Sequence, residues 1–331
     1  MRRTRHDVLT CAVALLVAGA ATAQAQPEPQ AGDRPLRVMS YNIKHGQTND
    51  PCTTPPREPG QPPPTDCGLD LQASIDVIRT YDPDIIGMQE IDRFWARSAY
   101  LDEPAVLSEA LGLPHVCYAP NLDHPADTHS PVPHQYGTVI LSRFPILECQ
   151  NTLLRRVATE EQRGLTLAVI NVRGVPLQFY NTHLHTTQPA RLLQTEDIAA
   201  VLDAAPAGPK LMTGDFNARS TFTTTVPEME PIYARLLDTW RLAPLPDADN
   251  PQGFTSSARL VGLPTSRIDY VFATDNVGAQ GTFVPITTAT RWAADHYPVV
   301  ADVTLPGAAV GVGKPTAPGQ TGRQGFVPRG D

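Results

Sequence analysis

The chain has 331 residues, of which 41% are hydrophobic, 18% are charged and 34 are proline. The apolar fraction is large enough to build a core, which excludes a disordered chain. An interior proline costs a helix about 3 kcal/mol, so this proline content also excludes a coiled coil or a helical solenoid. The net charge of −8 and the lack of a basic run do not suggest tight binding to nucleic acid through phosphates. They do not exclude a nuclease, because bound divalent cations supply positive charge locally.

The first 25 residues have the pattern of a secretory signal. Three arginines lie among residues 1–5, a mostly apolar run covers residues 8–21, and Ala23-Gln24-Ala25 fits a small-x-small cleavage site. The apolar run is too short to span a membrane comfortably. We therefore expect cleavage near Ala25 and a secreted or periplasmic protein whose charge is near −10; an uncleaved anchor is the alternative.

Four cysteines remain after the signal: Cys52, Cys67, Cys117 and Cys149. Four cysteines in an exported protein allow three pairings. The pairing expected first is a disulfide between Cys52 and Cys67, because both cysteines flank one Pro-rich loop. The remaining two cysteines would then form a Cys117–Cys149 disulfide. Free buried thiols are the alternative, which an oxidising compartment disfavours.

The first half of the chain alternates between loops and regular elements. Residues 26–35 are predicted to be a flexible leader, and residues 50–66, with seven prolines, a loop. Alternation and short apolar runs predict strands over 36–43 and 85–88. Helical spacing predicts a helix over 69–81 that ends before Pro83, and a second over 103–111 that is closed by Gly112.

The second half is richer in strands. The predicted strands cover residues 136–142, 166–172, 175–182, 210–213, 267–273 and 298–305, and an amphipathic helix covers 189–204. Residues 306–331 are Gly/Pro-rich and predict a disordered tail. No change of composition divides residues 36–305, so we expect one domain. Strands interleaved with a few helices, without regular βαβ alternation, predict an α+β or layered α/β architecture.

Polar side chains cluster where the apolar runs stop. These residues are Asn42, Glu90, His183, Asp215, Asn217, Asp269, Asp295 and His296. Strands that end at one edge of a sheet bring such residues together. Several carboxylates in one site repel one another and therefore call for a cation. Oxygen-rich ligands with few histidines and no thiolate favour Mg²⁺, Mn²⁺ or Ca²⁺ over Zn²⁺.

Each of these residues also has a purely structural interpretation. Glu90 can cap a helix or pair with Arg93, and Asp215 and Asn217 fit a turn. Asp269 is different, because a carboxylate inside an apolar strand needs a partner. His296 is the obvious one, since a carboxylate can fix the tautomer of an imidazole and hold its ring.

Seven short motifs together carry a resemblance to a known superfamily. They are Ser-Tyr-Asn42-Ile, Gln-Glu90, Tyr-Gly137-Thr-Val-Ile-Leu-Ser-Arg143, Asn-Thr-His183-Leu, Gly-Asp215-Phe-Asn217, Arg-Ile-Asp269-Tyr and Asp295-His296-Tyr-Pro-Val. The ordered set, spread over residues 38–303, resembles the DNase I-like endonuclease/exonuclease/phosphatase superfamily. The resemblance implies a four-layer α/β/β/α sandwich, with two central, largely antiparallel sheets flanked by helices. It also implies metal-dependent hydrolysis of phosphate esters.

The resemblance also implies a role for each residue. Glu90 would bind the metal, with Asn42 beside it, and Asp295 would lie in the metal and histidine network. Asp215 would orient and deprotonate the attacking water or contact a second metal. Asn217 and His183 would hold the phosphoryl oxygens, and His296 with Asp269 would form an acid/base or phosphate-stabilising pair. Mg²⁺ is the expected ion, Mn²⁺ and Ca²⁺ are alternatives, and the number of ions, one or two, stays open.

The function that follows is an exported metal-dependent phosphoesterase, more specifically a phosphodiesterase. Its substrate would be a nucleic acid, as for a secreted DNase or RNase, a phospholipid head group, as for a sphingomyelinase-like phospholipase C, or a soluble ester. Asp92-Arg93, Arg97-Ser98, Arg163-Gly164 and Gln188…Arg191…Gln194 look like a secreted or membrane-associated branch of the superfamily. The alternative from a different functional class is a protein that uses this fold for binding without catalysis. The loss of a metal ligand or a catalytic histidine would support it, but none of the expected site residues is missing. We expect a monomer without an obligate protein partner.

Overall fold

The computed structural model describes residues 35–48, 68–127, 131–221, 223–245, 247, 250–257 and 263–307. The predicted signal, the Cys52–Cys67 pairing, all of the leader except residue 35, and all of the tail except residues 306 and 307 lie outside these residues. Among the described residues, no helix has both the length and the apolar character needed to cross a membrane.

The main elements follow one another in chain order. They are β1 (Leu36–Asn42), α1 (Leu71–Tyr81), β2 (Ile85–Arg93), α2 (Glu103–Leu111), β3 (His115–His124), β4 (His134–Ser142), β5 (Ile146–Leu153), β6 (Gly164–Val172), β7 (Val175–His183), α3 (Gln188–Ala204), β8 (Lys210–Asp215), α4 (Glu230–Tyr233), β9 (Leu237–Asp238), α5 (Thr239–Leu242), β10 (Asp269–Ala273), β11 (Gly278–Phe283), α6 (Thr288–Ala293) and β12 (Val299–Thr304). Three short 3₁₀ helices cover Lys44–Gly46, Ala96–Ser98 and Pro227–Met229.

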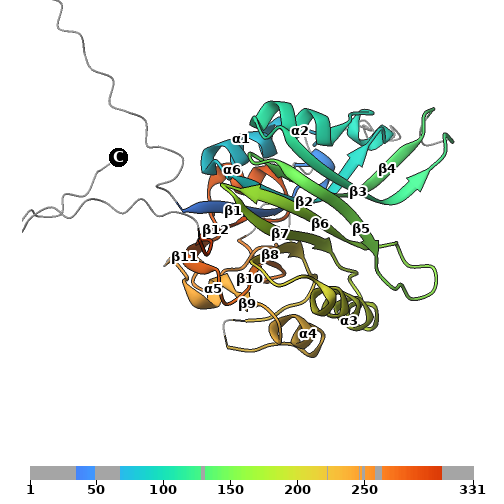
Figure 1. Cartoon of the computed structure of the whole chain (residues 1–331). Coiled ribbons are helices and arrows are strands. Elements are labelled where there is room, and N and C mark those ends of the chain that lie inside the picture. The colour runs from blue at the N-terminus through green and yellow to red at the C-terminus, as the bar shows by residue number, and fades with distance from the viewer. Residues whose placement is uncertain are drawn as a thin grey trace, which may run out of the picture.

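The strands form two six-stranded sheets, with the orders β11-β12-β1-β2-β4-β3 and β5-β6-β7-β8-β10-β9. Only β1–β2 and β7–β8 are parallel among the paired strands described. The sheets pack face to face, with α1, α2 and α6 over the first sheet and α3 and α4 over the second (Figure 1). This is the predicted α/β/β/α sandwich, with largely antiparallel sheets.

The predicted strand over 85–88 is wrong in length. Strand β2 continues to Arg93, and its pairing with β4 shifts register between Met88 and Ile91. Glu90 therefore lies inside the strand at a β-bulge rather than after its end. The helix predicted over 103–111 is confirmed at both ends: Asp102 accepts a hydrogen bond from the backbone at its start, and Gly112 adopts a left-handed conformation at its end.

The facing surfaces of the two sheets are apolar at one end and polar at the other. Since side chains alternate along a strand, the inward residues are Leu36, Val38, Ser40 and Asn42 in β1, Leu177, Phe179, Asn181 and His183 in β7, and Leu211, Thr213 and Asp215 in β8. All of them are buried. The apolar members close the core between the sheets, and the last residue of each strand opens the candidate site.

A layer of amide and hydroxyl groups joins the sheets below the site. Asn181 Nδ2 donates to the backbone oxygens of Met88 and Val139, and its Oδ1 accepts from Gln89 Nε2 at 2.7 Å. A Cβ at Gly87 would lie 2.0 Å from Thr213 Oγ1, so only glycine fits there. These contacts fix the position of β2 relative to β7 and β8, and hence of Glu90 relative to Asp215.

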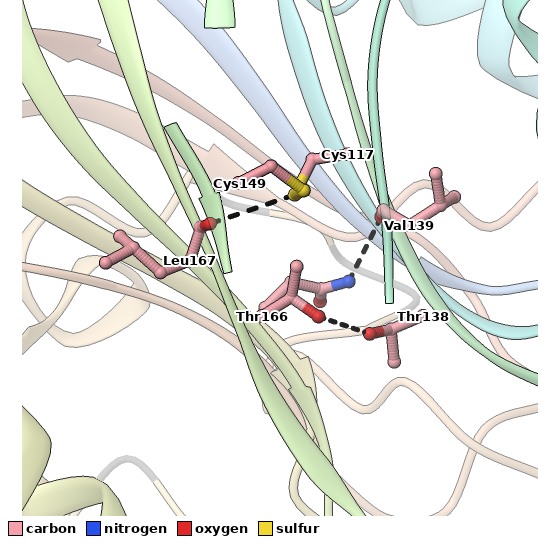
Figure 2. Close-up of a disulfide and its surroundings, with 7 residues drawn as sticks. Cys117, Thr138, Val139, Cys149, Thr166 and Leu167 are labelled. Carbon is pink, nitrogen blue, oxygen red and sulfur yellow. Dashed lines mark hydrogen bonds between the residues drawn. A yellow bond between two sulfur atoms is a disulfide. The ribbon is translucent and has the colours of Figure 1, made fainter. Parts of the chain in front are cut away.

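A disulfide between Cys117 and Cys149 connects the two sheets at one edge (Figure 2). Cys117 lies on β3 and Cys149 on β5, the end strands of their sheets. Close by, the hydroxyls of Thr138 and Thr166 are 2.7 Å apart and form a second link between the sheets. The Cys117–Cys149 pairing predicted from the sequence is confirmed.

Replacing both cysteines with alanine is expected to lower the free energy of unfolding by about 3–4 kcal/mol, because the loop they close spans a sequence separation of 32 residues. Urea denaturation followed by circular dichroism measures this loss. Cys117→Ala alone should give nearly the same loss as the double variant. An unchanged midpoint with an unchanged slope would show that the disulfide does not stabilise the fold.

Candidate active site

Three of the predicted residues lie side by side on adjacent strands of the second sheet. His183 on β7 is the register partner of Asp215 on β8, and Asp215 is the register partner of Asp269 on β10. The order of strands in the sheet alone therefore places the three side chains next to one another. His296, which lies just before β12 in the other sheet, reaches this row from across the interface.

Asp269 and His296 form a buried ion pair. His296 Nδ1 lies 2.9 Å from Asp269 Oδ2, and Thr255 Oγ1 donates to the same oxygen at 2.6 Å. Burial disfavours a charged imidazole, but the charges of Asp269 and Asp215 outweigh it and raise the pKa of His296 well above 6.5. The pair thus holds a protonated imidazole whose Nε2 lies 3.7 Å from Asp215 Oδ2.

Asp215 occupies the centre of the cluster. Its Oδ1 accepts from the backbone N–H of Asn217 at 2.9 Å, and its Oδ2 accepts from Asn42 Nδ2 at 3.1 Å. Burial, reinforced by the charge of Asp269, raises the pKa of Asp215 to about 7. A carboxyl group with this pKa can exchange a proton near neutral pH.

Asn42 links Asp215 to Glu90. Its Nδ2 also donates to Glu90 Oε1 at 2.9 Å, so one amide group holds two carboxylates. Glu90 adopts a left-handed backbone (φ 59°) at the β2 bulge, which turns its side chain toward the other sheet. Burial raises its pKa, although 24% of the side chain is exposed. Glu90 is therefore the carboxylate of the cluster that solvent can reach.

His183 and Asn217 complete the row on the opposite side. Arg163 Nη1 lies 2.8 Å from His183 Nδ1, and since a guanidinium only donates, Nδ1 accepts and Nε2 carries the proton. Burial and the charge of Arg163 lower the pKa of His183 well below 6.5, so the ring is neutral. Asn217 Nδ2 donates to the backbone oxygen of Leu184 and lies 3.3 Å from His183 Nε2. Because Nε2 carries a proton, the acceptor next to it is Asp215 Oδ2, at 3.4 Å, and not the Asn217 amide nitrogen.

Asp295 lies at the rim of the cluster. Its carboxylate pairs with Lys44 Nζ at 3.1 Å, and 30% of its side chain is exposed. Its charge helps to raise the pKa of His296, behind the larger influence of Asp269 and Asp215. The structure thus brings the other seven predicted site residues into one cluster and places Asp295 beside it.

The residues present fit a divalent cation. The ligand atoms of Asp215, Asp269 and His296 lie within 4.8 Å of one another, so this buried group could bind a metal. The 2.9 Å contact, however, already commits His296 and Asp269 to each other. Glu90 and Asp215 are better placed, because one neutral amide donates to both and burial raises the pKa of both. A cation would stabilise these two carboxylates.

Three residues of the site were not predicted from the sequence as site residues. Thr255 supports Asp269, Arg163 fixes the tautomer of His183, and His45 lies beside Glu90 with its Nδ1 4.0 Å from Glu90 Oε2. Thr255 lies in irregular backbone and His45 in a short 3₁₀ helix, and in neither does a periodic pattern indicate the direction of a side chain. Arg163 is preceded by charged residues that suggest an exposed loop, yet only 7% of it is exposed.

The raised pKa values predict that the metal-free protein loses stability as the pH rises. The favourable interactions of protonated His296 contribute fully to the stability of the fold below pH 6.5, the pKa of a histidine in the unfolded chain. This contribution is lost when the pH rises above the raised pKa that His296 has in the folded state. Ionisation of buried Asp215 destabilises the fold as the pH rises from about 4 to 7. In EDTA, Asp215→Asn should therefore melt at the same temperature as the wild type near pH 4 and at a higher temperature at pH 7.5. A melting difference that does not change with pH would contradict this.

The chain belongs to the endonuclease/exonuclease/phosphatase family, whose model matches residues 39–296. Members of this family are phosphoesterases or nucleases, so the cluster lies in a phosphoesterase- or nuclease-type hydrolase. An endonuclease/exonuclease/phosphatase from Beutenbergia cavernae is 26% identical, with a TM-score of 0.61 over 83% of this chain and 72% of that chain. A mannosyl-6-phosphatase from Bacteroides thetaiotaomicron shares the fold, with 18% identity and a TM-score of 0.59 over 82% of this chain and 100% of that chain. A search of curated proteins finds no match.

Proposed function

We propose that the protein is an exported phosphodiesterase that depends on a divalent metal, with Mg²⁺ as the expected ion. The observation that supports this most is the arrangement around Asp215: His296, held by Asp269, lies on one side, and Asn42 with Glu90 lies on the other. Such a cluster combines an acid, a base and a cation site within a few ångströms.

Glu90 and Asp215, with Asn42 between them, are the residues that would hold the metal. When bound, the metal would supply Lewis-acid charge at the phosphoryl oxygens and lower the pKa of a bound water. Asp215, at the centre of the cluster, accepts the proton of the attacking water. The backbone N–H of Asn217 and the amide of Asn42 hold its two oxygens in a fixed orientation for this step.

The remaining residues act on the phosphoryl group and the leaving group. His296 carries a proton at Nε2 and donates it to the leaving oxygen, while Asp269, which accepts a hydrogen bond from Thr255, holds the ring. His183 presents an N–H at Nε2, and this donor, with the amide of Asn217, stabilises negative charge that develops on the phosphoryl oxygens. The low pKa of His183 keeps it a neutral hydrogen-bond donor during the reaction.

Export is supported by the signal-like N-terminus together with the Cys117–Cys149 disulfide, which is typical of oxidising compartments. An exported enzyme meets extracellular nucleic acid, lipid head groups and soluble esters. The net negative charge of the chain disfavours nucleic acid among these three substrate classes. The mannosyl-6-phosphatase that shares the fold makes a soluble phosphate monoester the competing substrate class.

The test is an assay of purified residues 26–331 with Mg²⁺, Mn²⁺ or Ca²⁺ against bis-p-nitrophenyl phosphate, p-nitrophenyl phosphate, sphingomyelin and plasmid DNA. Metal-dependent hydrolysis of the diester, faster than of the monoester, is the expected result. Hydrolysis of the monoester alone would overturn the diesterase assignment. Absence of hydrolysis of every substrate with every ion would overturn the proposed function as a whole.

A further inference from the structure

The side chain of Arg97 is held in an unusually fixed position. Its Nε and Nη2 donate to the two carboxylate oxygens of Asp92 at 2.8 and 2.7 Å, and Asp92 is fully buried. The guanidinium carbon also lies 4.8 Å from the ring centre of Trp95 and 5.2 Å from that of Tyr136. Trp95 is fixed in turn, since its indole N–H donates to the backbone oxygen of Gln135.

This anchoring leaves one edge of the guanidinium available. A guanidinium has five N–H donors, and Asp92 accepts two of them, one from Nε and one from Nη2. In the part of the chain that the structure describes, Nη1 donates to no group, and 44% of the side chain is exposed. The Nη1–Nη2 edge, which matches the spacing of two oxygens of a phosphate or carboxylate, therefore has no acceptor for its Nη1 donors among the described residues.

Arg97 lies beside the Glu90 side of the cluster. Its anchor Asp92 is two residues beyond Glu90 on β2, or about 7 Å along the strand. Tyr136 is the register partner of Asp92 on β4. Arg97 is thus anchored close to Glu90 along β2 without being part of the cation site.

The neighbouring Arg93 shows what a purely structural arginine looks like in this segment. It is also bidentate to a carboxylate, Asp102, and also lies over aromatic rings, with 32% of its side chain exposed. Its Nη1, however, donates to Gln135 Oε1. Arg93 lines a separate cavity of about 740 Å³ between α2 and β3 and not the cluster. The free edge of Arg97 is the feature that a structural role does not explain.

We propose that Arg97, held by Asp92 and packed against Trp95 and Tyr136, binds a second anionic group of the substrate, separate from the phosphoryl group that is attacked. This rests on the proposed function, because it places the attacked group at the cluster around Asp215. It narrows the substrate class to phosphate esters that carry another phosphate or carboxylate a few bonds away. The rigid anchoring means that this anion is bound with little loss of side-chain entropy.

Binding of simple diphosphonates tests the proposal without turnover. The probes are ethane-, propane- and butane-diphosphonate, each compared with the alkylphosphonate of the same chain length, in excess Mg²⁺, by titration calorimetry. For at least one length, the wild type should bind the diphosphonate at least about tenfold more tightly than the monophosphonate, the effect of one charge-assisted bidentate contact. Arg97→Lys, which keeps the charge beside Asp92 but lacks the planar edge, should lose this preference.

Arg93→Lys is the matched control and should keep the wild-type preference. Melting temperatures show whether each variant is folded. If Arg97→Lys is unstable, the double variant Asp92→Asn/Arg97→Gln, which leaves no unpaired buried charge, replaces it and should lose the preference for diphosphonates in the same way. Equal binding of both probe types at every length, or an equal loss in the Arg93 and Arg97 variants, would overturn the proposal. Preference for diphosphonates without hydrolysis of any ester would instead leave the Arg97 site standing and remove the proposed function.

Discussion

Replacing Asp215 with asparagine is expected to lower kcat for bis-p-nitrophenyl phosphate at least ~10²-fold. The asparagine keeps the size of the side chain and can still accept the hydrogen bond from the backbone N–H of Asn217. It can neither take a proton from water nor place negative charge beside Asn42 and Glu90. Because the native carboxylate is destabilised by burial and by Asp269, the variant should lose activity without losing stability at neutral pH. Steady-state kinetics and thermal melting of the same preparation measure both quantities.

Asp203→Asn is the control for this variant. Asp203 is paired with Arg235 on the exposed face of the molecule, and exposed ion pairs contribute little. This variant should keep wild-type kinetics. If Asp215→Asn retained more than a tenth of the wild-type kcat, Asp215 would not be the group that activates water.

His296→Gln is expected to lower activity by ~10²-fold or more, and the size of the loss should depend on the leaving group. If His296 is the general acid, an ester with an alkoxide leaving group suffers far more than bis-p-nitrophenyl phosphate, because p-nitrophenolate leaves without a proton. An equal loss with both substrates would instead show that the Asp269–His296 pair stabilises the phosphoryl charge. The comparison of kcat for bis-p-nitrophenyl phosphate with kcat for a dialkyl phosphate, whose only leaving group is an alkoxide, decides between the two roles.

His185→Gln serves as the matched histidine control. His185 lies two residues after His183, but its Nδ1 accepts from the backbone N–H of Thr187 at the start of α3. Within the described part of the chain, it forms no hydrogen bond or ion pair with Asp215 or Asp269. Its kinetics should match the wild type with both leaving groups. Full activity of His296→Gln with both esters would remove His296 from the mechanism.

The fold was largely predictable because its central strands are apolar and bounded by clear turns. Strands β1, β6, β7 and β8 are buried over most of their length, and their apolar runs mark them in the sequence. The four end strands of the two sheets, β3, β5, β9 and β11, were missed. Each is an outer or half-exposed strand with a mixed composition; in β5, for example, most side chains are exposed. Without a buried face, a strand leaves little hydrophobic pattern.

Most residues of the cluster could be predicted from the sequence, but the geometry of the cluster could not. Asp269 stands out in the sequence as a carboxylate within an apolar strand, and the structure places it against His296. The position of Glu90 depends on a bulge and a left-handed residue, which no alternation pattern reveals. Likewise, the pairing of Asp295 with Lys44 and the support of Asp269 by Thr255 arise only when separate loops meet.

The central claim is that a divalent cation at the Glu90–Asp215 carboxylates drives hydrolysis of a phosphate diester. The most direct measurement is the rate of bis-p-nitrophenyl phosphate hydrolysis by the purified protein after dialysis against EDTA, and again after addition of Mg²⁺. In EDTA the wild type should show no activity above background, and addition of the ion should restore its activity fully, whereas Glu90→Gln should show no recovery. Undiminished activity after complete removal of divalent metal would contradict it.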